Sequence, residues 1–172
     1  MRKFTTTILL IFPLVMFGQV KFSTATFEEV IKESQKTSKL IFLQFESNGC
    51  EKCNEVADKA FEDAGLAKLL QESFVCVKIG PTHPDRELIS SLYNIQGFGS
   101  FFIDQQKTLL HTYLTTTTRA TSYKEQVEIV FNRAGEELRL NEMEKQYNSG
   151  EKTPGMLQLI LEKRKSLYLQ TD

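Results

Sequence analysis

Apolar residues recur along the chain with two different spacings, which together predict the order of helices and strands. Spacings of three and four residues, typical of helices with one buried face, occur in segments 24–38, 50–61, 63–73, 84–94 and 121–135. Dense apolar runs, typical of buried strands, occupy segments 39–47, 74–80, 100–104 and 108–114. Helix starts are indicated by Thr26, by Asp63, by Pro84, and by Ser122 with Glu125 at capping-box spacing.

The order of these segments predicts an α/β fold with a central mixed sheet flanked by helices. The early strands alternate with helices, which favours parallel pairing. Strands 100–104 and 108–114 are separated only by a short turn at 105–107 and predict an antiparallel hairpin at the edge of the sheet. We assign residues 20–135 to this domain.

Residues 136–172 differ in character and predict a C-terminal helical extension. Two helix-spaced apolar patterns are broken at "NSGEKTPG", residues 148–155. The extension either packs on the domain as an appendage or begins a longer helical structure.

The N-terminal segment has the pattern of a secretory signal peptide. Arg2 and Lys3 form a positive start, Ile8–Phe17 is apolar apart from Pro13, and a small residue, Gly18, follows. A retained membrane anchor is the alternative, although the run is shorter than the ~20 residues of a typical span. We assign residues 1–19 to the signal peptide and expect an exported, periplasmic or extracellular protein.

The charge of the chain argues against nucleic acid or a membrane surface as a partner after signal removal. The formal net charge is −1, and no basic stripe or basic tail is visible.

Cys50 and Cys53 form a C-x-x-C pair between a predicted buried strand and a predicted helix. At a helix N-terminus, the backbone N–H groups and the helix dipole favour a thiolate. Cys50 can then attack a substrate disulfide, and Cys53 can resolve the mixed disulfide. A structural disulfide and half of a metal site are the alternatives, although a tetrahedral site needs four ligands. Between the cysteines, Lys52 favours a thiolate and Glu51 opposes it.

The remaining cysteine and both histidines have plainer interpretations. Cys76 lies within a predicted buried strand and is expected to be a small core residue. His83, in a predicted turn, and His111, in a predicted strand, are expected to be polar surface residues.

From about Phe27 to Arg133 the chain resembles the thioredoxin family, and in particular exported proteins similar to the C-terminal domain of membrane thiol-reductant carriers. The resemblance rests on "LIFLQFESNGCEKC", "AFEDAGLAKLL", "FVCVKI" and "LYNIQGFGSFFID". It implies a thioredoxin-like fold, Cys50 as nucleophile, Cys53 as resolving thiol, and no cofactor beyond the Cys50–Cys53 disulfide.

Two departures from the family concern residues near the cysteines. Gly49 stands where the family usually has Trp. Gln44, which cannot titrate, stands six residues before Cys50, where the family often has a buried acid. Lys78 matches the family's neighbouring lysine but would lack that acid as its partner.

The third departure is in the substrate-docking loop that the resemblance assigns to Phe98, Gly99 and Ser100. The family has a cis-proline here, in G-[FY]-P-T, whereas this chain has "GFGS". Because a cis bond before a non-proline residue costs ~3–4 kcal/mol, we expect a trans bond or a loop shaped by glycine.

These features favour an exported thiol–disulfide oxidoreductase that acts on protein disulfides or thiols and exchanges electrons with a partner. Two alternatives remain open. One is a binding module on the same scaffold with weakened redox chemistry. The other is a protein that holds a soft metal ion with Cys50 and Cys53.

Overall fold

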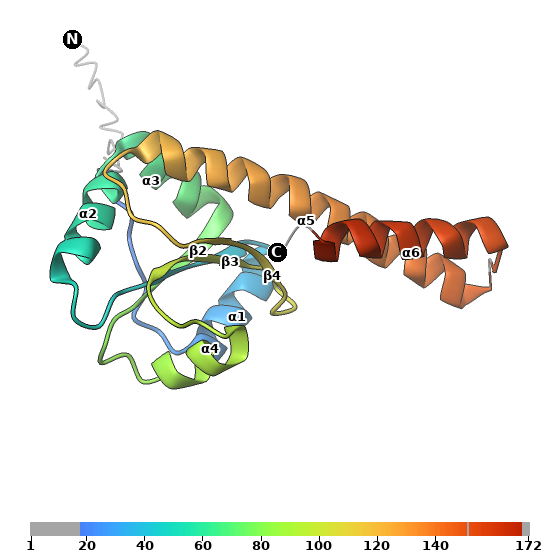
Figure 1. Cartoon of the computed structure of the whole chain (residues 1–172), viewed down its shortest axis with the longest axis horizontal. Helices are drawn as coiled ribbons and strands as arrows, with labels where there is room; N and C mark the ends of the chain where they lie inside the picture. The colour runs from blue at the N-terminus through green and yellow to red at the C-terminus, as the bar shows by residue number, and fades with distance from the viewer. Residues whose placement is uncertain (1–17, 151, 170–172) are drawn as a thin grey trace, which may run out of the picture.

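The computed structural model describes residues 18–150 and 152–169, which form four strands and six helices (Figure 1). The strands are β1 (Leu40–Phe45), β2 (Phe74–Ile79), β3 (Gly99–Ile103) and β4 (Leu109–Tyr113). The helices are α1 (Phe27–Thr37), α2 (Glu51–Phe61), α3 (Ala64–Ser73), α4 (Arg86–Tyr93), α5 (Ala120–Ser149) and α6 (Pro154–Leu169). Nearly all of the predicted signal peptide lies outside the described residues. None of the described helices is long and apolar enough to cross a bilayer.

The strands form one mixed sheet in the order β2-β1-β3-β4, which confirms the predicted fold class. β1 pairs parallel with β2 and antiparallel with β3, and β3 and β4 form the predicted hairpin. β1 is therefore the central strand, and five of its six residues are buried.

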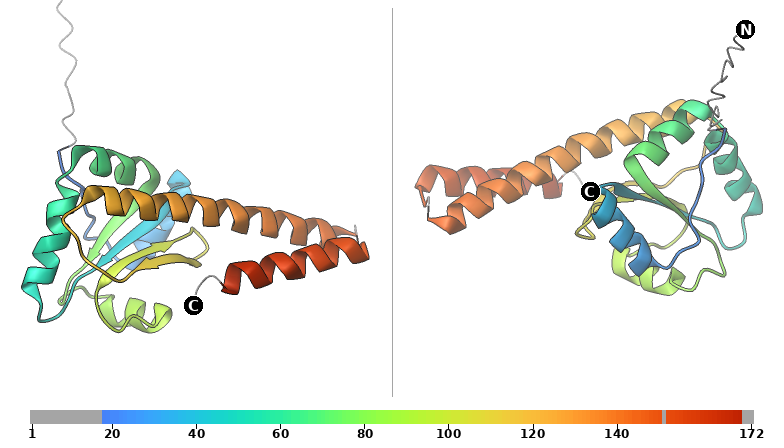
Figure 2. Two further views of the ribbon diagram at one scale, coloured as in Figure 1. Left: turned by 45° about the horizontal axis from the view of Figure 1, so that its top comes forward. Right: turned by 180° about the vertical axis from the view of Figure 1, so that it is seen from behind.

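Helices cover both faces of the sheet, and each face has its own apolar core (Figures 1 and 2). On one face, α2, α3 and α5 pack around Phe42, Phe61 and Tyr123. On the other face, α1 and α4 pack against side chains that include Ile41 and Leu43. Successive residues of a strand point to opposite faces, so β1 contributes to both cores.

The helix starts show where local sequence signals sufficed. Thr26 forms a complete capping box with Glu29, and Asp63 accepts a hydrogen bond from the Leu66 backbone at 2.7 Å, as expected for both caps. The predicted cap at Ser122 is wrong, because α5 already begins at Ala120. Pro84 precedes α4 instead of lying in its first turn, since Asp85 is the N-cap.

α5 runs without interruption for 30 residues, across the position where the sequence suggested a boundary between residues 135 and 136. Its second half leaves the sheet and pairs with α6 as a helical hairpin that projects from the domain (Figure 2). Among its described side chains, the apolar residues Leu140 and Ile160 are buried. Salt bridges link Glu136 to Lys163, and Glu144 to Arg164.

Cys76 is buried in β2, as expected for a core residue, and it is the free cysteine of the described residues. Burial raises the pKa of its thiol to about 12. Cys76 is therefore almost fully protonated at neutral pH, and it is unsuited to disulfide exchange in the folded protein.

The folded, oxidised protein should hence be nearly inert to a thiol reagent. We expect Cys76 to react with dithionitrobenzoate at pH 8 at least about a thousandfold more slowly in the folded than in the unfolded chain, because both the thiolate fraction and access are low. Stopped-flow absorbance with and without denaturant measures this ratio. Rapid reaction of the folded protein would contradict the burial of Cys76.

Candidate functional site

Cys50 and Cys53 are joined by a disulfide at the start of α2, with their Cα atoms 5.3 Å apart. Cys50 occupies the N-cap position, and no side chain caps this helix. Both cysteines are half-buried, whereas Glu51 and Lys52 between them are exposed. The first backbone N–H groups of α2 thus lie next to Cys50 without a competing side-chain acceptor, an arrangement that stabilises a thiolate once the disulfide is reduced.

Under this helix, Gln44 occupies the position where the thioredoxin resemblance suggested an acid. Its side chain is buried and accepts a hydrogen bond from the Ser100 hydroxyl at 2.7 Å. The two residues are direct partners in the β1–β3 pairing. A neutral amide bonded to a hydroxyl can be buried without an unpaired charge, and this explains how β1 tolerates a polar residue here.

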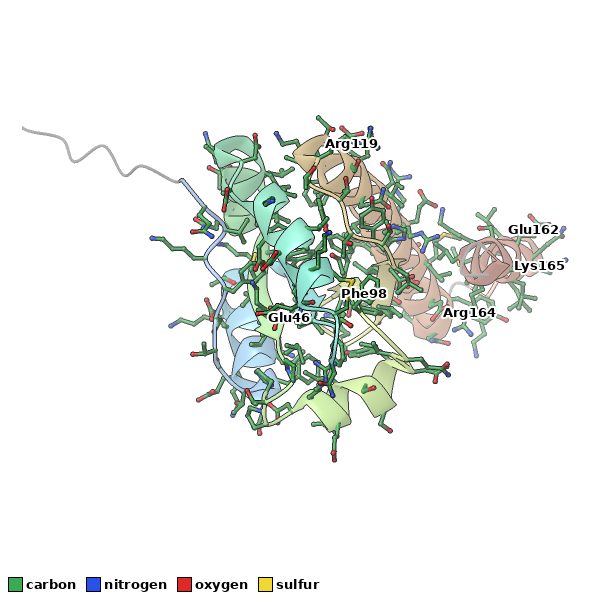
Figure 3. All side chains as sticks on the ribbon, turned by 60° about the vertical axis from the view of Figure 1, so that its left-hand side comes forward. Glu46, Phe98, Arg119, Glu162, Arg164 and Lys165 are labelled. Atoms are coloured by element: carbon green, nitrogen blue, oxygen red, sulfur yellow. A yellow bond between two sulfur atoms is a disulfide. The ribbon has the colours of Figure 1, made fainter. Side chains whose placement is uncertain are left out.

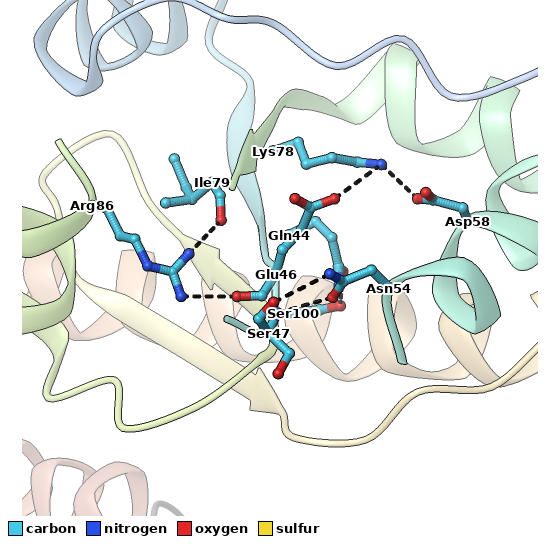
Figure 4. A network of polar contacts seen from close by, with 9 residues as sticks. All are labelled: Gln44, Glu46, Ser47, Asn54, Asp58, Lys78, Ile79, Arg86 and Ser100. Atoms are coloured by element: carbon cyan, nitrogen blue, oxygen red, sulfur yellow. Dashed lines mark hydrogen bonds and ion pairs between the residues drawn. The ribbon is translucent and has the colours of Figure 1, made fainter. Parts of the chain in front are cut away.

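Lys78 has acidic partners that the sequence did not predict (Figure 4). It lies opposite Gln44 in the β1–β2 pairing, but its ammonium group is 2.5 Å from Asp58 on α2 and 3.6 Å from Glu46 after β1. Position 44 supplies no acid, yet the lysine is paired with both of these carboxylates. Lys78 thereby links α2 to the ends of β1 and β2.

Arg86 fixes the same ends of the strands from the other side (Figure 4). Its guanidinium donates hydrogen bonds to the backbone oxygens of Ile79 at 3.0 Å and Glu46 at 2.9 Å. It also lies 4.3 Å from the centre of the Phe45 ring. Sequence alone gave no signal for this role, because it depends on the position of α4 against the sheet.

A further pair of hydrogen bonds joins the loop before Cys50 to the helix after it. The Asn54 side chain bonds both the backbone N–H and the backbone carbonyl of Ser47. The sequence analysis did not predict this role of Asn54. The only sequence feature that points to it is the position of Asn54 directly after Cys53.

Gly99, at the start of β3, has a backbone conformation that explains the absence of proline. No peptide bond in the described residues is cis, in agreement with the expected trans bond, and Gly99 has a φ of 145°. A Cβ atom at Gly99 would lie 2.8 Å from the Tyr113 oxygen and 3.2 Å from the Leu114 Cα. β4 therefore approaches so closely that only glycine fits without strain.

The predicted docking-loop residues do not share one environment. Phe98 is half-buried in the loop directly before β3 (Figure 3). Gly99 and Ser100 are buried in the sheet. Ser100 faces Gln44 and is unavailable for direct contact with a partner.

A polar cleft begins at the loop before α2 and continues along α4. One cavity of about 340 Å³ is lined by residues that include Ser47, Asn48 and Gly97. A second, of about 640 Å³, shares Asn48 with the first and extends along α4 as far as Ser91. The cleft thus connects the surface two residues before Cys50 with one flank of α4.

The described residues also bear on the metal hypothesis. Among residues 18–150 and 152–169, no group of three or more His, Cys, Asp and Glu side chains lies close enough to hold a metal ion. Both histidines were expected at the surface, but both are half-buried. His83 lies in a turn as expected, with its Nε2 buried and without a hydrogen-bond partner among the described residues, and His111 bonds to Gln126 at 2.8 Å.

The close approach at Gly99 predicts a cost for any side chain there. We expect Gly99→Ala to lower the free energy of unfolding by about 2 kcal/mol, because the new Cβ meets backbone atoms and the φ is strained. Gly97→Ala is the matched control, since a Cβ at Gly97 meets no atom within 4 Å, and it should change stability by less than about 0.5 kcal/mol. Urea denaturation of both variants measures the difference, and equal stabilities would refute the argument.

Known structures share this fold at low sequence identity. A DsbH oxidoreductase has a TM-score of 0.58 at 15% identity, covering 74% of this chain and 95% of its own. A putative disulphide-isomerase from Bacteroides thetaiotaomicron has a TM-score of 0.57 at 18% identity, covering 66% and 94%. A thioredoxin from Thermus thermophilus has a TM-score of 0.53 at 17% identity, covering 64% and 87%. At these identities the similarity establishes the thioredoxin-like fold.

The sequence itself matches a family. A search of curated proteins gave no significant match. The model of the thioredoxin-like DsbH family, described as a protein of unknown function, DUF255, matches residues 20–130. This match covers more than half of the chain and nearly all of the domain that carries the cysteine pair. The protein is therefore a member of the thioredoxin-like DsbH family, DUF255.

Proposed function

We propose that the protein is a thiol–disulfide oxidoreductase that works through Cys50 and Cys53. The observation that carries this proposal is the Cys50–Cys53 disulfide at the uncapped N-terminus of α2, on a thioredoxin-like scaffold. No bound cofactor is needed for such a reaction, because the pair itself stores two electrons.

In the reducing direction, the Cys50 thiolate attacks one sulfur of a substrate disulfide. A mixed disulfide forms, and the other substrate sulfur leaves as a thiolate that takes up a proton. The Cys53 thiolate then attacks the Cys50 sulfur, which releases the second substrate thiol and closes the Cys50–Cys53 disulfide. The substrate gains two electrons, so a partner dithiol must reduce the pair before the next turnover. The oxidising direction is the same sequence in reverse.

Residues around the pair have supporting roles in this proposal. Lys52 and Glu51 are exposed beside the cysteines. The positive charge of Lys52 stabilises a thiolate, and the negative charge of Glu51 destabilises it. Lys78 is paired with two carboxylates, Asp58 and Glu46, so this cluster supplies no net positive charge at the end of the sheet. Gln44 adds no proton acceptor, so proton transfer from Cys53 relies on water or on the substrate thiolate.

We further propose that the protein acts outside the cytosol on protein thiols and disulfides. The pattern of residues 1–19 supports export, and an oxidising compartment suits a Cys50–Cys53 pair that cycles with partners. Phe98 and the cleft along α4 provide the surface on which a polypeptide would lie next to Cys50.

Two alternatives remain testable. A binding module with weakened chemistry is favoured by the neutral Gln44 and by Gly99 in place of proline. It requires a disulfide that no physiological couple reduces. A soft-metal protein requires stoichiometric metal in elemental analysis of the reduced, full-length chain.

Replacement of the resolving cysteine should trap substrates. We expect Cys53→Ser to accumulate mixed disulfides through Cys50 and to lose turnover, because the second attack is missing. Non-reducing electrophoresis with mass spectrometry identifies the trapped partners, and Cys50→Ser is the control that should trap none. The proposal fails if Cys53→Ser traps nothing and the wild-type protein reduces no disulfide.

A bulky side chain in the cleft should weaken the binding of protein substrates but not of small disulfides. We expect Ser91→Trp, on the flank of α4 that lines the cleft, to raise KM for a protein disulfide about fivefold. The rate with a small aromatic disulfide should be unchanged. Leu88→Trp is the matched control, because Leu88 is an exposed α4 residue outside the cleft lining. Equal KM values for the two variants would remove the cleft from substrate binding.

A further inference from the structure

The side chain of Asn54 closes a ring around the redox disulfide. Its Oδ1 accepts a hydrogen bond from the Ser47 backbone N–H at 2.9 Å, and its Nδ2 donates to the Ser47 backbone carbonyl at 3.2 Å. Ser47 precedes Cys50 and Asn54 follows Cys53, so the disulfide lies inside the segment that these two bonds close (Figure 4 shows the bonds).

This contact is the main restraint on the chain just before Cys50. The backbone N–H of Glu46 donates a hydrogen bond to the Ile79 carbonyl, and the backbone carbonyl of Glu46 accepts one from Arg86. Beyond it, Asn48 and Gly49 are exposed, and Gly49 has a φ of 115°, where glycine is flexible. Among the described residues, the bonds to Asn54 are the hydrogen bonds that hold the 47–49 segment.

The disulfide and the Asn54 contact restrain the same segment, but only one of them persists through the reaction. When the disulfide is reduced, its covalent restraint on Cys50 disappears. The Cys50 backbone stays at the helix, because its carbonyl accepts hydrogen bonds from the Cys53 and Asn54 N–H groups at 3.0 and 3.4 Å, but no side-chain bond holds the Cys50 sulfur. In the dithiol form, the path of the chain into Cys50, and with it the direction of the Cys50 sulfur, therefore depends on the Asn54–Ser47 contact.

We propose that Asn54 is a positioning residue that keeps the Cys50 sulfur at the N-terminus of α2 after reduction, and thereby keeps Cys50 ionised. The inference rests on the proposed function, because it concerns the dithiol form of the same site. Asn54 acts through the backbone of Ser47 and does not itself touch the substrate.

The charges around Cys50 do not change in the variants that test this role. These charges are Glu51 and Lys52 on α2, Glu46 after β1, and Lys78 on β2 with its partner Asp58. Asn54→Ala removes an uncharged side chain, so any change in the ionisation of Cys50 reports its position relative to the helix N-terminus.

The test compares alkylation rates of Cys50 in the reduced, full-length protein. We expect Asn54→Ala to slow iodoacetamide modification of Cys50 about fivefold at pH 6, where the thiolate fraction limits the rate. The rate at pH 10 should be unchanged, because the thiol is then fully ionised. Peptide mass spectrometry separates Cys50 from Cys53. Ser47→Ala is the matched control and should match the wild type, because Ser47 contributes only backbone atoms to the contact.

Several results would overturn the inference. An equal loss of rate at pH 6 and pH 10 would indicate a general change in access, and an unchanged rate at both would leave Asn54 without this role. A Ser47→Ala effect as large as that of Asn54→Ala would also count against it.

Hydrogen exchange on the wild-type protein tests the inference without a variant. The Ser47 amide should stay protected in both redox states, and rapid exchange of this amide in the reduced form would refute a persistent contact. Failure of the proposed function looks different. The wild-type Cys50 would then show an ordinary thiol pKa and no disulfide exchange, whatever Asn54 does.

Discussion

The placement of β1 between β2 and β3 determines the geometry of the redox site. Parallel pairing with β2 sets Lys78 beside Gln44, and antiparallel pairing with β3 sets Ser100 on the other side of Gln44. The end of the same strand leads directly into the loop before Cys50. A shift of this register by one residue would turn Gln44 to the opposite face and would separate it from Ser100. The chemistry of α2 thus depends on backbone hydrogen bonds made several residues earlier.

Much of this architecture could be predicted from the sequence because its signals are local. The dense apolar run of β1, the caps at Thr26 and Asp63, and the hairpin turn at 105–107 each specify their own element. The C-x-x-C pair at a helix start is equally local. Export, substrates and the roles of individual site residues stay predictions.

The features that the sequence did not predict depend on contacts between residues far apart in the chain or on the length of a whole helix. The predicted helix ended at residue 135, whereas α5 continues through Gly135 to Ser149. A Cβ at Gly135 would meet no atom within 4 Å, so the glycine lies in open space, and a single glycine costs only about 1 kcal/mol in a helix. The partners of Lys78 and the contact of Asn54 depend on side chains that meet across elements, and neither spacing nor composition reveals such meetings.

The helical hairpin of α5 and α6 has a different physical basis from the domain to which it is attached. The domain is held by two apolar cores, whereas the hairpin combines few buried apolar side chains with salt bridges. Lys163 and Arg164 lower the pKa values of Glu136 and Glu144, respectively. Their contribution is therefore present at neutral pH and is lost as the pH falls through those lowered values. One continuous helix, α5, thus joins a domain held by buried apolar side chains to an arm whose salt bridges are lost in acid.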